Sequence, residues 1–274
     1  TTNINPAYAG SRGVMSVFGL YRTQWVGLEG APKTSAFSIN TPLNNSKLGL
    51  GVSVINDRIG PTNENTISAD LSYTVPTSET FNLSFGIKGT ANIFNLDINK
   101  LDPKDQGDPQ FQNFNNKFSP NVGAGVYLHS DKAYIGLSVP NFIETSRYDE
   151  ANKEVAIHKE KINYYLIAGY VFDLNAELKF KPAVLTKMVE GSPLQVDLSG
   201  NFMFNDKFVV GVAYRWSAAL SAMVGFQATE GLYIGYGYDR ETTNLSNYNS
   251  GSHEIFLRFE LFNNYSRITS PRFF

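Results

Sequence analysis

The sequence alternates apolar and polar residues at every second position, in segments of about ten residues. In the clearest segment, 67–75, every second residue from Ile67 to Val75 is apolar and the residues between them are serine, aspartate or threonine. Residues 194–202 follow the same pattern, as do 254–261 apart from one phenylalanine on the polar side. Successive side chains of a β-strand point to opposite faces of a sheet. Each segment is therefore predicted to be a strand with one apolar and one polar face.

Glycine occupies much of the second face in two further segments. At 48–54 the residues between the leucines and valines are glycine or serine, and at 232–238 Gly235 and Gly237 hold such positions. Glycine within a strand often marks a close approach by another part of the chain. We therefore expect something to pack tightly against these glycines.

About fourteen strands are predicted, and their connections alternate in length. Weaker strand patterns lie at 14–23, 34–41, 81–92, 120–129, 133–139, 162–172, 177–187, 207–216 and 218–227. The short connections are 42–47, 76–80, 130–132, 173–176, 205–206 and 228–231, with a very tight one near Ser217. The longer connections are 24–33, 56–65, 93–119, 140–161, 188–193 and 240–252. Short periplasmic turns and longer extracellular loops are typical of outer-membrane barrels. The sequence thus predicts an all-β protein, a transmembrane antiparallel β-barrel with both chain ends in the periplasm.

The predicted organisation is a periplasmic N-terminal segment at 1–12, an outer-membrane barrel at 13–262 and a periplasmic C-terminal tail at 263–274. The sequence opens without Met or an apolar leader, so we expect that a signal peptide has been removed. A mean hydropathy of -0.22 agrees with a barrel, because only alternate residues need to face lipid. Outer-membrane lipid is the partner that this fold implies.

The motifs that would carry chemistry are missing from the sequence. The net charge of -2 gives no basic surface for nucleic acid, and there is no cysteine. None of the three histidines forms a ligand-spaced pair. Four aspartates cluster at 97–108, but their spacing does not match the alternate ligands of a calcium loop. We therefore predict no enzyme activity, no cofactor, no metal site and no nucleic-acid partner.

Charged side chains fall on the face opposite the apolar one, which is the lumen face of a barrel. The seven are Asp70, Lys88, Asp197, Arg215, Glu254, Arg258 and Glu260. Unpaired charges would be costly wherever water is excluded. We favour a mixed-sign network that braces or plugs the interior, and the selectivity lining of a conducting pore is the alternative.

The two longest connections, 93–119 and 140–161, are too long to be simple hairpin turns. They contain aromatic residues beside mixed charges, namely Phe111, Phe114 and Tyr148. Aromatic anchors with a charged rim suit a protein interface. These three residues are therefore predicted to bind a protein partner.

Five blocks spread along nearly the whole chain are similar to blocks of a known family. They are NPAYAGSRG at 5–13, RTQWVGLEGAP at 22–32, LGLGVSVINDRIGPT at 48–62, AGYVF at 168–172 and SHEI at 252–255. In these blocks the chain resembles the PorP/SprF family, outer-membrane proteins associated with the type IX secretion system of the Bacteroidota.

The resemblance implies a role in secretion, gliding motility and cell-surface anchoring in place of catalysis. It implies that the barrel binds a secreted, adhesin-type cargo through the cargo's type IX C-terminal signal domain. An OmpA-like peptidoglycan-binding protein is the implied periplasmic partner. The family supplies no catalytic residues to transfer. A passive outer-membrane channel for small solutes is the alternative function, and a soluble β-sandwich adhesin is the alternative fold.

Overall fold

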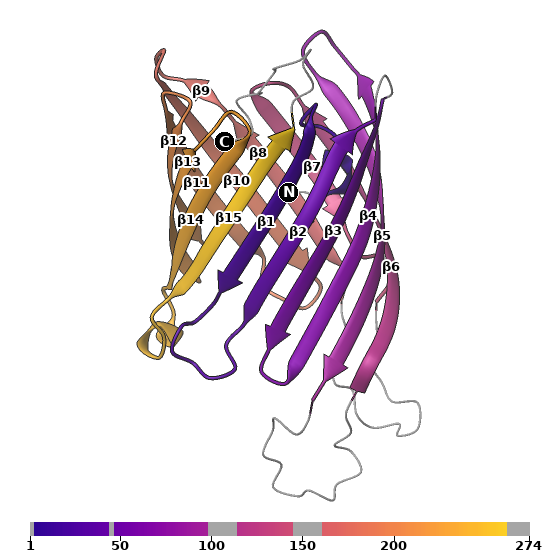
Figure 1. Cartoon of the computed structure of the whole chain (residues 1–274), viewed down its shortest axis with the longest axis vertical. Coiled ribbons are helices and arrows are strands. Elements are labelled where there is room, and N and C mark those ends of the chain that lie inside the picture. The colour runs from indigo at the N-terminus through magenta and orange to yellow at the C-terminus, as the bar shows by residue number, and fades with distance from the viewer. Residues whose placement is uncertain (1–2, 44–46, 98–113, 145–160, 262–274) are drawn as a thin grey trace, which may run out of the picture.

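Fourteen antiparallel strand positions close into a barrel in this computed structural model (Figure 1). The structure describes residues 3–43, 47–97, 114–144 and 161–261. The first strands are β1 (Met15–Thr23), β2 (Lys33–Pro42), β3 (Leu48–Ile59), β4 (Thr62–Pro76), β5 (Asn82–Leu96), β6 (Phe114–His129) and β7 (Ala133–Val139). The others are β8 (Asn163–Tyr170), β9 (Phe172–Asp173), β10 (Leu178–Val189), β11 (Gln195–Phe204), β12 (Phe208–Arg215), β13 (Ala219–Gln227), β14 (Leu232–Glu241) and β15 (Ser252–Leu261).

Each strand pairs with its neighbour in the sequence, and β1 pairs with β15 to close the barrel. β8 and β9 both pair with β10, so together they occupy one strand position. The break between them is at Val171, which is fully buried and whose backbone N–H donates to the carbonyl of Lys132 at 2.8 Å. The predicted 14-stranded barrel is confirmed, although the strand predicted at 162–172 is interrupted here.

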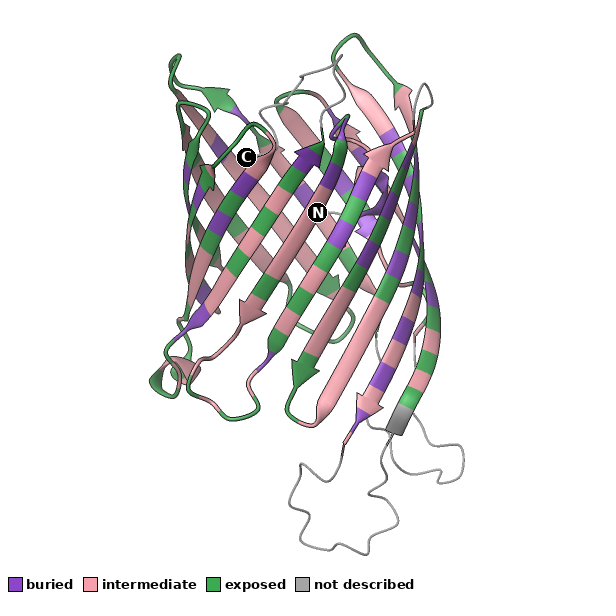
Figure 2. Ribbon diagram, viewed as in Figure 1, coloured by how far each residue is buried: buried purple, intermediate pink, exposed green. Residues whose placement is uncertain are grey.

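The two faces of the strands differ as the alternation predicts. Leu71 is 39% exposed on the outside of β4, whereas the neighbouring Ser72 is 1% exposed on the inside. Figure 2 shows this alternation of exposed and buried residues along β2, β4 and β5. An apolar outer surface of this kind faces lipid, and the polar side chains line the lumen. In the described part of the chain, no helix is long and apolar enough to cross a membrane.

Two predicted loops are shorter than the sequence suggests. The connection predicted at 56–65 is wrong, because β3 continues to Ile59 and β4 begins at Thr62. The outward residues Asn56, Arg58, Asn63 and Asn65 are polar, so the apolar alternation ends there, but the backbone pairing of β3 with β4 continues. Gly60, with φ of 54°, makes the tight turn. The connection predicted at 93–119 is likewise shortened by β5 and β6.

The segment before β1 lies inside the barrel. It contains a short 3₁₀ helix, η1 (Pro6–Tyr8), which Figure 1 shows within the lumen near the end where β1 begins. Residues 1–12 were predicted only as a periplasmic segment, and the alternation pattern gave no sign of packing against the inner wall. The predicted tail, 263–274, lies outside the described residues.

Candidate functional site

The N-terminal segment folds locally around Asn5 and Pro6. The Asn5 side-chain oxygen accepts a hydrogen bond from the backbone N–H of Ala7 at 3.0 Å and so caps η1. Pro6 occupies the first helical turn, where its fixed φ suits the helix and its missing N–H costs nothing. The Asn5 amide also donates to the carbonyl of Val126 in β6 at 3.1 Å. Asn5 and Ala7 have no exposed surface, so this part of the segment is fully shielded from solvent.

The segment packs against inward glycines of β3, β5 and β6. We call these three residues, Gly49, Gly86 and Gly125, the glycine cradle. A Cβ atom on Gly86 would overlap the backbone of Pro6 and Ala7. Cβ atoms at the other two positions would overlap the carbonyl of Ala9 and the side chain of Asn5. The cradle therefore receives the segment because it has no side chains there. The close approach predicted for the glycines at 48–54 is thus an approach by the chain's own N-terminus.

Polar and apolar contacts fix the segment further. The Ser72 hydroxyl donates to the carbonyl of Ala9 at 2.7 Å. Ala7 packs with Tyr127 and Ile167 in a small buried cluster. The rings of Tyr8 and Tyr127 meet edge to face with centroids 5.7 Å apart. The aromatic contacts favour one orientation of η1 against the wall.

Arg12 connects the segment to the far side of the barrel. Its Nε atom donates to the Glu260 carboxylate on β15 at 2.7 Å, and both side chains are buried. Burial disfavours the charged guanidinium, but the charge of Glu260 and the hydrogen bonds to Glu260 and to the Tyr8 hydroxyl outweigh it, so the pKa of Arg12 is raised above its usual value. The segment therefore spans the lumen from β6 to β15.

The predicted lumen charges lie in ion pairs on the inner wall. Lys88 Nζ lies 2.8 Å from Asp70 Oδ1, and Arg215 Nε lies 2.8 Å from Asp197 Oδ1. Register places both pairs on directly opposed residues of adjacent strands. Within β15, Arg258 Nε lies 3.3 Å from Glu260 Oε1.

Glu254 is paired with Arg22, at 3.2 Å from its Nη1 atom, and Arg22 also contacts Asp239. Arg12, Arg22 and Asp239 were not singled out from the sequence. The strand predicted at 14–23 has no clean polar face, because Phe18 and Leu20 also point inward, and this hid the charge of Arg22.

The predicted partner-binding residues are mostly outside the described part of the chain. Phe111 and Tyr148 both lie there. Phe114 begins β6, so it belongs to the end of a strand. Their role in binding stays a prediction. Among the described residues, no group of three or more histidine, cysteine, aspartate or glutamate side chains is placed to hold a metal ion.

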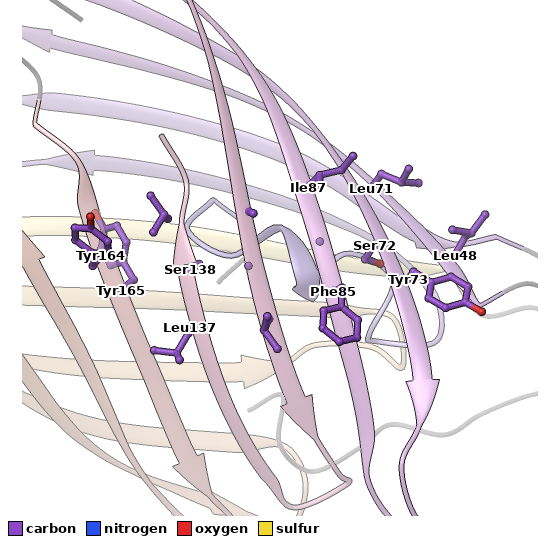
Figure 3. Close-up of a pocket in the computed structure, with 15 residues that line it drawn as sticks. Leu48, Leu71, Ser72, Tyr73, Phe85, Ile87, Leu137, Ser138, Tyr164 and Tyr165 are labelled. Carbon is purple, nitrogen blue, oxygen red and sulfur yellow. The ribbon is translucent and has the colours of Figure 1, made fainter. Parts of the chain in front are cut away.

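An apolar groove of about 680 Å³ lies on the outer wall over β3–β8 (Figure 3). Leu71, Phe85 and Leu137 are among its lining residues, and Gly86 and Gly125 also line it. Gly86 and Gly125 therefore border the groove on the outside and the N-terminal segment on the inside. The groove lacks charged groups that could carry out chemistry.

A family model described as the type IX secretion system membrane protein PorP/SprF matches residues 1–259. The chain belongs to the PorP/SprF family. The match includes the N-terminal segment as well as the strands, and it confirms the resemblance of the five sequence blocks. This PorP/SprF protein is thus an outer-membrane barrel of a secretion-system family connected with gliding motility, and neither the family nor the fold is that of a known enzyme class.

Solved structures similar to this PorP/SprF chain are outer-membrane barrels. The Acinetobacter baumannii outer membrane protein Omp33 has a TM-score of 0.53 at 9% identity, over 90% of this chain and 98% of that one. The CymD monoaromatic hydrocarbon channel has a TM-score of 0.52 at 11% identity, over 95% and 92%. The P. putida toluene transporter TodX has a TM-score of 0.51 at 8% identity, over 96% and 94%. These likenesses establish the fold alone. A search of curated protein sequences gave no match.

Proposed function

We propose that this PorP/SprF barrel holds a secreted, adhesin-type protein at the cell surface and conducts no solutes in its resting form. The observation that carries the proposal is the N-terminal segment, which spans the lumen from β6 to β15. A solute channel needs an unobstructed path, whereas an anchoring protein needs a rigid wall and a binding surface at its ends. The inner charges also pair with one another, which favours bracing over a selectivity lining.

Cargo recognition is assigned to the long connections. The outer wall presents apolar side chains to lipid and offers little that a soluble partner could recognise. Connections 97–113 and 140–162 join the ends of β5 to β6 and of β7 to β8, and they contain Phe111 and Tyr148. We assign these connections to the extracellular side, where the type IX C-terminal signal domain of the cargo would meet them.

The opposite end carries short turns with exposed ion pairs. Lys132 pairs with Asp173, and Lys179 pairs with Asp206, both at 2.5 Å. A charged rim of this kind suits a transient polar contact with a protein. We assign this end to the periplasm, where an OmpA-like peptidoglycan-binding protein would bind.

Loop deletion tests the cargo role. Removing 98–113 or 145–160 should leave a barrel that still folds and resists detergent, because every strand is retained. The cargo should then move from the cell surface to the medium, measured by fractionation and immunoblotting. A matched control removes the short-turn residues 44–46 at the other end. Cargo that stays on the cell surface with both long connections shortened would contradict this assignment.

A passive channel is the second candidate. The inner residues Ser199, Asn201 and Ser221, on β11 and β13, are polar and only partly buried, so this side of the lumen is less filled. CymD and TodX, which share the fold, are described as a hydrocarbon channel and a toluene transporter. Single-channel recordings should show no steady conductance for the intact protein and a conducting state after deletion of residues 3–12. Steady conductance of the intact protein would favour the channel.

A further inference from the structure

The outer surface of β2–β4 changes from apolar to polar toward the end where β1, β3 and β5 finish, drawn at the bottom of Figure 1. The last apolar row across these strands is Phe37, Val54 and Ile67, which lie opposite one another and are exposed. The next outward row is Ser35, Asn56 and Asn65. On each of these three strands the outward side chains thus change from apolar to polar between these two rows, which marks the edge of the lipid-facing band there.

The following row contains two basic side chains. Lys33 of β2 lies directly opposite Arg58 of β3, and both are exposed. In the described ranges, neither side chain makes an ion pair with a carboxylate. The neighbouring Asp57 points to the lumen, where it accepts a hydrogen bond from the Thr34 hydroxyl. Like charges directly opposed on one face destabilise a sheet unless an anion lies between them.

The same row continues around the barrel without a carboxylate. From β14 to β5 its members are Tyr238, His253, Thr23, Lys33, Arg58, Asn63 and Asn95. Each of these side chains can donate a hydrogen bond, from a hydroxyl, an amide, a ring N–H or a cationic group. Because the strands are tilted, only members on neighbouring strands lie at nearly the same depth, so Lys33 and Arg58 are the cationic pair at the border of the apolar band.

We propose that Lys33 and Arg58 form a binding site for the phosphate of an anionic membrane lipid. Lys33 and Arg58 each lie beyond the last outward apolar residue of their own strand, and headgroups lie where the apolar band ends. The Arg58 guanidinium can give two parallel hydrogen bonds to a phosphate, and Lys33 adds a point charge from the adjacent strand. This site is independent of the proposed cargo role, and in the proposed orientation it faces the outer leaflet.

The test measures lipid retention by native mass spectrometry, with phosphatidylglycerol against the zwitterionic phosphatidylcholine as probes. The wild-type protein should prefer phosphatidylglycerol. A basic side chain at an anionic surface strengthens binding about fivefold, so K33Q/R58Q should weaken phosphatidylglycerol binding about 25-fold. R58K keeps the charge and should lose only the bidentate geometry, with a smaller effect.

The matched control is K47Q/K207Q, which removes two exposed lysines at the other end of the barrel and should leave the preference unchanged. Folding of each variant is checked by the mobility of unheated protein in a gel. If the double variant does not fold, the single variants K33Q and R58Q decide, with about fivefold losses each. A wild-type protein without preference, or a folded variant that keeps it, overturns the proposal.

Discussion

The wall formed by β3–β7 and the wall formed by β11–β15 have the same kind of inward glycines but different neighbours. In the first, Gly49 and Gly86 lie against the backbone of the N-terminal segment. In the second, Gly225 lies against the ring of Tyr233 and Gly235 against the ring of Phe256. Inward-facing glycines thus make room for backbone on one wall and for aromatic rings on the other. A backbone seated on a cradle cannot move aside without leaving it, whereas a ring can rotate or shift.

The ion pairs of the two walls differ in the same way. Lys88 and Asp70 are 2.8 Å apart with side-chain exposures of 3% and 0%, whereas Arg215 and Asp197 are equally close with exposures of 40% and 17%. Equal distances therefore do not mean equal energies, because solvent screens the second pair and not the first. The wall around Asp70 is therefore shielded from solvent, whereas the other wall is open to water at β11 and β12 but not at β15, where Glu260 is buried with Arg12.

The largest difference between the walls is expected for arginine at an inward serine. By alternation alone, Ser72 and Ser199 are equivalent polar positions where arginine should be mild. Ser72 is buried and donates to the carbonyl of Ala9, so S72R should displace the segment and cost more than about 4 kcal/mol. Ser199 lies on the inner face of β11 and is only partly buried, so S199R should lower the free energy of unfolding by less than about 1 kcal/mol. Urea titration of the barrels in lipid vesicles measures both, and equal costs would remove the distinction between the walls.

A second pair of variants removes the cation of each ion pair, Lys88 on one wall and Arg215 on the other. K88M leaves the Asp70 carboxylate buried without its cation and should lower the free energy of unfolding by about 3 to 5 kcal/mol. R215M leaves Asp197 within reach of water and should cost less than about 1 kcal/mol. The double variant K88M/D70L should recover most of the loss. Failure of that recovery would show that the cost of K88M does not come from the unpaired carboxylate.

The smallest effect expected is that of a single methyl group on each glycine wall. G86A places a Cβ atom on the backbone of Pro6 and Ala7, and overpacking of this kind costs about 1 to 3 kcal/mol. G235A meets the ring of Phe256, which can shift, so a cost below about 1 kcal/mol is expected. G86A should also speed proteolysis of the segment at Arg12 by trypsin. Equal stability and equal proteolysis of the two variants would contradict the packing of the N-terminal segment against the β3–β7 wall.

The strands were predictable because alternation is a local property of the sequence. Segment 67–75 shows its two faces in nine residues, and β4 contains all of it. The tight hairpin at Gly60 was not predicted because the alternation pattern follows side-chain polarity. The β3–β4 backbone pairing continues through Asn56 and Asn65, where both side chains are polar and the pattern has ended. For the inward charges, the sequence indicated the face but not the partners, since Arg12 meets Glu260 across 248 residues of chain. The glycines indicated a close approach, but nothing local named the approaching segment.

The most direct test of the account is a disulfide between the segment and the cradle wall. The chain has no native cysteine, and a Cβ atom on Gly51 would lie 3.5 Å from the Cβ of Ala9, within the range of a disulfide. Oxidation of A9C/G51C in native membranes should therefore give a crosslink, seen as a mobility change that reductant reverses. The control A9C/A213C, with its second cysteine on β12, should give none. Absence of the first crosslink in a folded barrel, or equal formation of both, would contradict a segment seated on the β3–β7 wall.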